Sequence, residues 1–413
     1  LAFVLGGVSV VFLYFTWGFD SFYMVSSQIW GTMESFTLVA IPLFVFMAMI
    51  LERTGVAKDL YRMMHLWCGG LRGGLAIGTL GICAVFAAMV GISGAAVVAM
   101  GTIALPSMLE RGYDKKMALG VINTGGGWGI LIPPSILMIL YALITGVSVG
   151  KMFAAGIMPG ILLMVLTAIY ILVRCHLQPE LAPALPKEER GTWPEKLRAL
   201  RAVLLPIGVV IMVLGSIIGG ITTPTEAAAM GVLGALISAA VYRQFKWSIL
   251  QEAAIRTFKL TGMIMWILFA AHAFSAAYQS MGAQDLIEGL MNMIPGGPWG
   301  IIVAMMVIVF LLAMVLDPVG IMLITLPVFM PIVESLGFDP IWFGILFVIN
   351  MEIGYMTPPF GFNLFYLKGV VPPSITMKDI YSSIIPFVIV EIVGLGLIMI
   401  FPQIATYLPD LLF

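Results

Sequence analysis

Residues 125–135, with the sequence GGGWGILIPPS, are the stretch around which the chain is organised. They lie inside an apolar segment long enough to cross a lipid bilayer, yet they contain four glycines and the pair Pro133-Pro134. Glycine weakens a helix entropically, and proline lacks the amide hydrogen and clashes with the preceding turn, so a helix must break here. Broken backbone at membrane depth is tolerated only where protein or an aqueous cavity satisfies its polar groups. The stretch is therefore either a packing kink or the wall of a site.

The composition predicts a membrane protein. Of 413 residues, 61% are hydrophobic and 10% are charged, and the mean hydropathy is +1.09. Soluble domains are about 45–50% apolar and about 25% charged, so we expect an all-α polytopic membrane protein. The net charge of -1 gives no reason to expect a nucleic-acid partner. Cys68, Cys83 and Cys175 form no CxxC motif, so neither a disulfide framework nor a zinc site is expected.

Apolar segments of about 20 residues predict the membrane crossings. Full spans are expected near 2–16, 36–51, 117–145, 152–173, 202–219, 225–242, 260–280, 341–367 and 381–408. Two further apolar pairs, 72–109 and 298–335, are interrupted at Gly91-Ile92-Ser93-Gly94 and at Asp317-Pro318-Val319-Gly320. Surface or connecting helices are expected at 18–35, 55–66 and 246–258, and a polar loop at 174–201.

Each interrupted pair is either a re-entrant hairpin or two complete spans, because both arrangements return the chain to the same side. The first interruption is flanked by alanine, valine and methionine, whereas a turn in water would be polar. The pattern therefore favours re-entrant hairpins. Orientation follows from the 20 lysines and arginines, since cytoplasmic loops carry an excess of both. With the N-terminus in the cytoplasm, all of them, Lys187 included, lie on the cytoplasmic side except Lys151.

The two halves of the chain repeat with a shift of 225 residues. This shift places Pro106 on Pro331, Gly112-Tyr113-Asp114 on Gly337-Phe338-Asp339, Gly129 on Gly354, Pro133-Pro134 on Pro358-Pro359 and Tyr141 on Tyr366. The unmatched crossing at 202–219 inverts the second copy, so the first hairpin enters from the cytoplasm and the second from the periplasm. The expected parts are a first repeat at 1–173, a cytoplasmic loop with a linking span at 174–224, and an inverted second repeat at 225–413. Paired broken helices in an inverted repeat indicate the substrate site of a secondary transporter.

Residues that carry oxygen gather at the two tips and the two breaks, which should meet near the membrane midplane. Hydroxyl, amide, carboxylate and freed backbone oxygens suit a small alkali cation such as sodium. The candidate ion-binding residues are Ser93, Gly94, Asn123, Gly126, Asp317, Asn350, Gly354 and Thr357, with Thr124 beside them. The alternative for each hydroxyl is a hydrogen bond to a neighbouring turn. No cofactor other than sodium as the coupling ion is expected.

Asp317 is the leading ion candidate, because an ionisable group within a membrane segment is costly and is functional by default. Glu352 and Glu391 also lie in apolar spans without a lysine or arginine at comparable depth. For them, protonation, exposure to a cavity and contact with a partner subunit all stay open. His272 is expected to be a helix-packing histidine rather than a proton relay.

The substrate is expected to be a small carboxylate held by helix N-termini, whose free N–H groups carry partial positive charge. Half-helices begin near both tips and both breaks. The candidate substrate-binding residues are Ala95, Pro134, Ser135, Gly320, Pro359 and Asn363. Bound cations would supply the positive charge that the membrane segments lack.

Several motifs together resemble the large membrane subunit of TRAP transporters, the tripartite ATP-independent periplasmic transporters. They are GISG at 91–94, GYD at 112–114, GILIPPS at 129–135, TPTEAA at 223–228 and TPPFGFNL at 357–364, with AIPLF at 40–44. The resemblance covers nearly the whole chain. It implies sodium-coupled uptake of organic acids across the bacterial inner membrane through an elevator-like motion. It also implies two partners, a small four-helix membrane subunit and a periplasmic substrate-binding protein, within membrane lipid.

The resemblance also places sodium ligands near Ser93 and around Asp317. The first tip commonly reads Ser-Gly-Ser in that family, whereas Ala95 follows Gly94 here, so one hydroxyl is absent. The nearest alternative is a stand-alone sodium- or proton-coupled carboxylate symporter of the same architecture. An intramembrane enzyme is disfavoured because the chain has no HExxH motif, no paired catalytic aspartates and only three histidines. A channel is disfavoured because two hairpins supply two gates, which alternating access requires.

Overall fold

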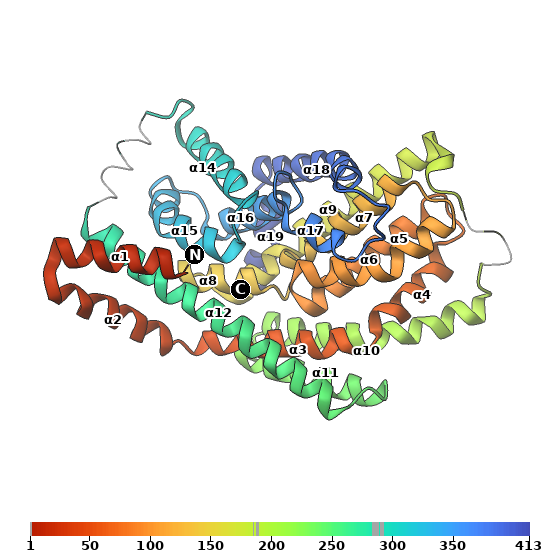
Figure 1. The fold of residues 1–413 in the computed structure, drawn as a ribbon, viewed down its shortest axis with the longest axis horizontal. Coiled ribbons are helices and arrows are strands. Elements are labelled where there is room, and N and C mark those ends of the chain that lie inside the picture. The colour runs from red at the N-terminus through yellow and green to blue at the C-terminus, as the bar shows by residue number, and fades with distance from the viewer. Residues whose placement is uncertain (1, 185, 187–189, 283–288, 290–292) are drawn as a thin grey trace.

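The computed structural model describes the chain except residues 1, 185, 187–189, 283–288 and 290–292 (Figure 1). Lys187 therefore lies outside the described residues. The described residues form helices and turns, and no strand occurs among them. Eight helical segments in this part of the chain are long and apolar enough to cross a membrane. The chain is thus an all-α polytopic membrane protein, as its composition predicts.

Six long helices form an outer layer of the molecule. They are α1 (Ala2–Trp17), α2 (Ser21–Met33), α3 (Ala40–Arg53), α10 (Trp193–Ile218), α11 (Pro224–Val241) and α12 (Trp247–Ser280). Figure 1 shows this layer along the lower edge, with α12 packed against α1 and α2 at one end and against α3 at the other. Small residues allow the close approach, because a Cβ added to Gly6 would lie 3.2 Å from the Cβ of Ala270.

The first half of the inner body contains a helical hairpin followed by a broken helix. After α4 (Val56–Cys68), the hairpin consists of α5 (Gly74–Val90) and α6 (Ser93–Glu110), which are separated only by Gly91 and Ile92. The broken helix consists of α7 (Lys115–Gly127), the 3-10 turn η3 (Trp128–Ile130) and α8 (Ile136–Thr145), and α9 (Val149–Leu177) follows it. The interruption and the break both fall where the sequence predicts them.

The second half repeats this order of elements. Its hairpin consists of α14 (Gly297–Ala313) and α15 (Pro318–Ser335), its broken helix of α16 (Pro340–Tyr355) and α17 (Phe362–Lys368), and α18 (Met377–Ile400) follows. The turns before the broken helices match closely, since Gly112 and Gly337 have φ of 75° and 76°, a region that favours glycine. Asp114 and Asp339 then cap the next helices, and the Pro133-Pro134 and Pro358-Pro359 bonds of the two breaks are both cis.

Three expectations about element bounds are wrong. The span expected at 381–408 is two helices, because Pro402 has no N–H to continue α18 and α19 (Gln403–Leu412) starts after it. The connecting helix expected at 246–258 is continuous with the span at 260–280, since both belong to α12. The polar loop expected at 174–201 is shorter, because α9 reaches Leu177, a single turn η4 (Pro179–Leu181) follows, and α10 begins at Trp193. The predicted repeat boundary at 173 accordingly falls inside α9.

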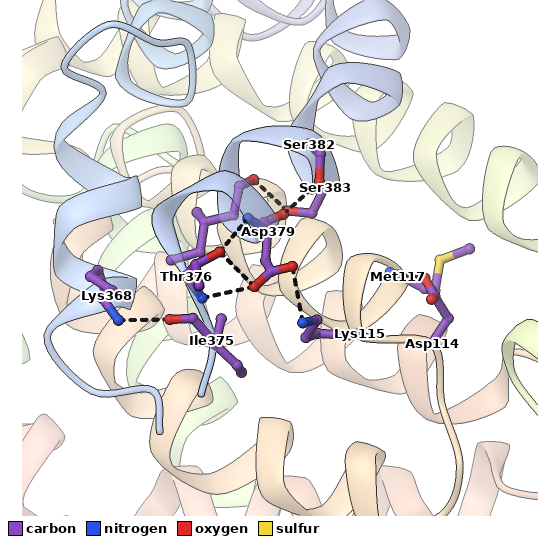
Figure 2. Close-up of polar contacts among 10 residues, drawn as sticks. Asp114, Lys115, Met117, Lys368, Ile375, Thr376, Asp379, Ser382 and Ser383 are labelled. Carbon is purple, nitrogen blue, oxygen red and sulfur yellow. Dashed lines mark hydrogen bonds and ion pairs between the residues drawn. The ribbon is translucent and has the colours of Figure 1, made fainter. Parts of the chain in front are cut away.

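Polar contacts tie the connecting segments together at one end of the molecule. Figure 2 shows Lys115 at the start of α7 reaching Asp379 at the start of α18, with 2.9 Å between nitrogen and oxygen. Nearby, Lys368 Nζ donates to the carbonyl of Ile375 at 2.6 Å. The Asp114 N–H donates to the carbonyl of Leu181 at 2.7 Å. We call this the basic end, and it comprises residues 53–59, 68–73, 110–116, 178–184, 190–192, 242–246 and 368–379.

Candidate functional site

The first hairpin tip packs directly against the first break. A Cβ added to Gly129 would lie 2.7 Å from the carbonyl carbon of Ile92 and 2.8 Å from the amide nitrogen of Ser93, so only glycine permits this approach. One turn earlier, a Cβ on Gly126 would lie 2.3 Å from Val97 Cγ2. The tip and the break therefore form one packed unit, as the sequence analysis expects of them.

The second tip meets the second break in the same way. A Cβ added to Gly354, which the repeat places opposite Gly129, would lie 2.3 Å from the Cβ of Ala313 at the end of α14. The N–H of Gly361 donates to the carbonyl of Met314 at 3.4 Å, and the amide nitrogen of Asn350 donates to the carbonyl of Met306. The glycines of the two breaks thus serve the same purpose in both halves.

The two halves also contact each other across the site. A Cβ on Gly94, in the first turn of α6, would lie 2.8 Å from the ring of Tyr366 on α17. Tyr366 therefore packs on the first tip from the half-helix that follows the second break. The repeat pairs Tyr366 with Tyr141, and it was the signal that could have pointed to this contact.

Tyr141, which the repeat pairs with Tyr366, contacts the hairpin of the second repeat, since its hydroxyl lies 3.3 Å from Sδ of Met330 on α15. Its hydroxyl donates to the carbonyl of Pro340 at 2.6 Å, at the point where α16 begins. The helix that carries it, α8, packs against α15 of the second hairpin, just as α17 packs against α6 of the first. Each half-helix that follows a break thus covers the hairpin of the other repeat.

Several buried polar atoms at the breaks have no partner in the described part of the chain. They are Oδ1 of Asn123, Oγ1 of Thr124, and both side-chain polar atoms of Asn363. All three residues are 0% exposed, so water does not satisfy these atoms at the surface. Unpartnered buried polar atoms are costly and call for an explanation. Two of them are oxygens on adjacent residues of α7, and this donor set fits a small hard cation.

Other predicted site residues use their polar atoms within the fold. The carboxylate of Asp317 accepts from the N–H of Gly320 at 3.1 Å and caps α15. The hydroxyl of Ser135 caps α8 and also donates to the carbonyl of Ile130. The hydroxyl of Thr357 donates to the carbonyl of Ile353 at 2.6 Å. For Ser135 and Thr357 the local hydrogen bond, which was the alternative reading, is present.

The remaining candidates divide into buried and exposed positions. Ser93 and Asn350 are 2% and 3% exposed, and Pro134 is buried beside Gly91, where a Cβ would lie 2.7 Å from its carbonyl oxygen. Ala95 is half-buried in the first turn of α6. Pro359 is exposed, and its carbonyl accepts from the hydroxyl of Tyr381 at 3.1 Å. The first break is therefore covered, whereas part of the second break reaches the surface.

Glu352 and Glu391 are both 0% exposed and lie against the first break. Trp128 Nε1 donates to Glu391 Oε1 at 3.1 Å, and a Cβ on Gly127 would lie 3.1 Å from Glu352 Oε1. The other Glu391 oxygen and both Glu352 oxygens have no partner among the described residues. Neither carboxyl group forms an ion pair with a lysine or arginine of the described residues.

His272 lies away from the tips and breaks, on the side of α12 that faces α15. It lines a cavity of about 220 Å³ together with Leu326, Met330 and Glu334 of α15. Its ring is half-buried. His272 thus lies between the outer layer and the second hairpin, and its helix-packing role stays a prediction from the sequence.

Comparisons with known proteins place this arrangement among membrane transporters. A family model described as the DctM component of the tripartite ATP-independent periplasmic transporter matches residues 1–404. The C4-dicarboxylate TRAP transporter large permease protein DctM of Vibrio cholerae is 36% identical, with 100% of this chain and 94% of that protein covered. The ectoine TRAP transporter large permease protein TeaC of Halomonas elongata is 34% identical, with 94% and 89% covered. The YdaH transporter of Alcanivorax borkumensis has a similar fold, with a TM-score of 0.67 over 97% of both chains and 14% identity.

Proposed function

This chain belongs to the DctM component family of tripartite ATP-independent periplasmic transporters, and we propose that it drives sodium-coupled uptake of a small organic acid across the bacterial inner membrane. It is a large permease component of a transporter and not an enzyme. The observation that carries the proposal is the packing of each hairpin tip against its own helix break, with the two halves joined where α17 packs against α6 and α8 against α15. Paired breaks in corresponding halves are the usual location of a transporter's substrate and ion sites.

Coupling to sodium is supported by the donor atoms around the two breaks. At the first, Oδ1 of Asn123 and Oγ1 of Thr124 are buried without a partner in the described part of the chain. At the second, Asp317 supplies a carboxylate at the tip, and the amide of Asn350 is held in place through its nitrogen. The ligands we propose are these four residues with Ser93, Gly94, Gly126, Gly354 and Thr357. Sodium bound there would contribute positive charge beside the substrate.

The carboxylate of the substrate is proposed to lie beside the start of α6. No side chain caps the first N–H groups of α6, whereas Asp317 caps α15 and Ser135 caps α8. An uncapped helix N-terminus favours an anion. Asn363, with both polar atoms unpartnered among the described residues, would supply a further hydrogen bond. The names of the two relatives agree with this chemistry, because C4-dicarboxylates and ectoine all carry a carboxylate.

The partners are proposed to be a small four-helix membrane subunit and a periplasmic binding protein that delivers the substrate. Helices α1 and α2 and the 3-10 turn between them (Gly18–Asp20) leave large apolar side chains uncovered, including Phe15, Phe19 and Tyr23, each about 80% exposed. Lipid or a membrane subunit would cover this surface. The basic end is proposed to face the cytoplasm, which places the N-terminus there. The alternative is a stand-alone carboxylate symporter that needs no binding protein.

A transport experiment separates these two alternatives. The chain is reconstituted into liposomes with the membrane subunit with which it co-purifies, and uptake of labelled succinate or ectoine is followed. We expect uptake to require an inward sodium gradient and a substrate-loaded periplasmic binding protein. Uptake that is as fast without the binding protein would establish the stand-alone symporter. Uptake that follows a proton gradient in sodium-free buffer would refute sodium coupling.

The cation ligands are tested separately by a binding measurement. Sodium, compared with potassium, should raise the Tm of the purified chain, because a ligand that binds only the folded state stabilises it. Asp317→Asn should reduce this sodium-dependent shift. Asparagine still caps a helix, so the fold should persist. The matched control is Asp114→Asn, which replaces an aspartate cap at the basic end and should leave the sodium-dependent shift intact. An unchanged shift in the Asp317 variant would remove Asp317 from the ion site.

A further inference from the structure

A large cavity lies at the basic end, outside the site described above. It has a volume of about 890 Å³ and is bounded by α4, by the start of α10 and by the end of α11, with residues 190–192 closing one side. Helices α4 and α10 lie side by side there (Figure 1). Gly191 holds the closing segment against α4, because a Cβ on it would lie 2.5 Å from Leu66 Cδ2. The cavity is therefore part of the packed fold.

The lining of the cavity is strongly basic. Among the described residues that line it, four are arginines, Arg62, Arg190, Arg198 and Arg201, against two carboxylates, Asp59 and Glu195, so these six residues sum to a formal charge of +2 (4 − 2). Arg62, Arg198 and Arg201 make no hydrogen bond or ion pair within 4 Å with another described residue. Their charge is therefore available to a ligand.

Glu195 is already engaged within the fold. Its carboxylate accepts from the N–H and the hydroxyl of Thr192, both at 2.8 Å, in a capping box at the start of α10. These hydrogen bonds from Thr192 hold the pKa of the Glu195 carboxyl below its ordinary value, with a smaller contribution from Arg198 and Arg62. Asp59 lies in the first turn of α4, where a negative charge complements the helix N-terminus. Both carboxylates thus have structural roles, and the guanidinium groups of Arg62, Arg198 and Arg201 remain for an anion.

Arginine is well suited to phosphate. Its planar guanidinium donates two parallel hydrogen bonds to phosphate oxygens, and it is more weakly hydrated than an ammonium group. Basic cavities between membrane helices on the cytoplasmic side bind the headgroups of acidic phospholipids. The chemistry of this cavity therefore fits a phosphate ester, whose source is either a lipid or a soluble metabolite.

The surroundings of the cavity favour a lipid. Two exposed apolar rows run away from it along neighbouring helices: Leu204, Ile207 and Ile211 on α10, and Leu233, Ile237 and Val241 on α11. Val241 also lines the cavity, so one row begins inside it. Each row follows helical spacing and therefore occupies one helix face. Acyl chains fit such faces, whereas a soluble phosphate would make no use of them.

Two tryptophans follow residues that line the cavity in the chain, Trp67 after Leu66 and Trp193 after Thr192. The rings of Trp67 and Trp193 pack edge to face with centroids 6.2 Å apart, and Lys196 Nζ lies 5.4 Å from the centroid of the Trp193 ring. Tryptophan is enriched at the boundary between membrane and water. These tryptophans favour a position of the cavity at headgroup level, from which the apolar rows would extend toward the membrane interior.

We propose that this cavity binds the phosphate headgroup of an anionic phospholipid, whose acyl chains lie along the exposed faces of α10 and α11. The site is separate from the hairpin tips and breaks, so the inference does not depend on the substrate or on the coupling ion. Its ligand would hold α4, α10 and α11 together at the basic end of the outer layer.

The test compares lipid binding by the full chain and by charge variants. The detergent-purified chain is titrated with phosphatidylglycerol, with phosphatidylcholine and with soluble glycerol phosphate, while Tm and the number of bound lipids by native mass spectrometry are recorded. We expect phosphatidylglycerol to bind and to raise the Tm, and the other two probes to do neither. Arg198→Gln with Arg201→Gln should weaken phosphatidylglycerol binding by about 25-fold, from about fivefold for each arginine.

A matched control removes two charges outside the cavity, by Lys246→Gln with Lys259→Gln, both of which are exposed. This variant should bind phosphatidylglycerol as the unaltered chain does. If the double arginine variant does not fold, Arg198→Lys, which keeps the charge but loses the planar fork, should still show weakened binding. Equal loss in the lysine control, or glycerol phosphate binding as tightly as phosphatidylglycerol, would overturn the proposal.

Discussion

At the scale of single residues, the first break is marked by two carboxyl groups that are buried beside Trp128 and its neighbour Gly127. Glu352 and Glu391 are removed from water without a compensating cation among the described residues. Ionised carboxylates in such surroundings are very unfavourable. The sequence analysis identified both residues from their position in apolar spans. It could not place them against Gly127 and Trp128, because that contact joins segments more than 200 residues apart in the chain.

A neutral replacement of Glu391 is therefore expected to be tolerated. Glu391→Gln retains the shape and the oxygen that accepts from Trp128, so its Tm should stay close to that of the unaltered chain. Glu391→Ala leaves a cavity and a buried indole N–H without a partner, at a cost of about 3 kcal/mol. Thermal unfolding of the detergent-purified variants measures this difference. Glu110→Ala, at an exposed helix end, is the control and should change little. If glutamine destabilises as much as alanine, the carboxylate charge itself is required.

At the scale of helices, the repeat predicted more of the structure than hydropathy did. The shift of 225 residues correctly paired the turns at Gly112 and Gly337 and the breaks at Gly129 and Gly354. Hydropathy misplaced the bounds of α12, because it detects only the apolar part of a helix, whereas α12 begins in a charged stretch at Trp247 and continues into the apolar span. Arg53 on α3 donates twice to Glu252 at 2.6 Å, which satisfies the carboxylate without ending the helix. Long-range pairs of this kind leave no local signal.

The glycines of the two breaks give a matched pair of substitutions. Gly129→Ala would bring a Cβ within 2.8 Å of backbone atoms of Ile92 and Ser93, and Gly354→Ala would bring one within 2.3 Å of the Ala313 Cβ. Neither neighbour is the flexible end of a side chain, so each change should separate a tip from its break and cost about 2 kcal/mol. Transport and Tm should both fall.

Gly396→Ala is the control for these two variants, because it lies in α18 with open space around it. Removing a helical glycine there should stabilise the chain by up to about 1 kcal/mol. Full activity and an unchanged Tm in either break variant would mean that the tips do not need this close contact.

At the scale of the whole molecule, the fold class followed from composition, and the candidate site was predicted from the paired breaks. Ser93, Asn123, Asn350 and Asn363 are all nearly or fully buried in the region that the repeat identified. The sequence could not reveal that the two breaks differ in how far they are exposed at the surface. The prolines of the first break are buried, whereas Pro359 and Phe360 reach the surface. Two similar sequences cannot reveal which half is covered, since this depends on how the inner body is positioned against the outer layer.

This asymmetry predicts the side from which the second break is accessible. The segment that follows it leads through Lys368 into the basic end, so Phe360, which is 47% exposed, should face the same compartment as that end. On a background without Cys68, Cys83 and Cys175, we expect Phe360→Cys to react with a membrane-impermeant thiol reagent in inside-out vesicles. Phe245→Cys, in the basic end and 56% exposed, should react from the same side. Ile221→Cys, 78% exposed in the turn between α10 and α11, should react only from the other side.

Sodium and substrate provide the second arm of this labelling experiment. A ligand shifts an equilibrium between two conformations only through its differential affinity for them. If the two repeats alternate in exposing their breaks, a ligand that favours the opposite conformation should slow the labelling of Phe360→Cys. The labelling of Phe245→Cys should be unaffected. Reaction of Phe360→Cys from the same side as Ile221→Cys would reverse the assignment of the open side. Labelling at one rate under all ligand conditions would show that the second break stays accessible throughout the transport cycle, which alternating access does not allow.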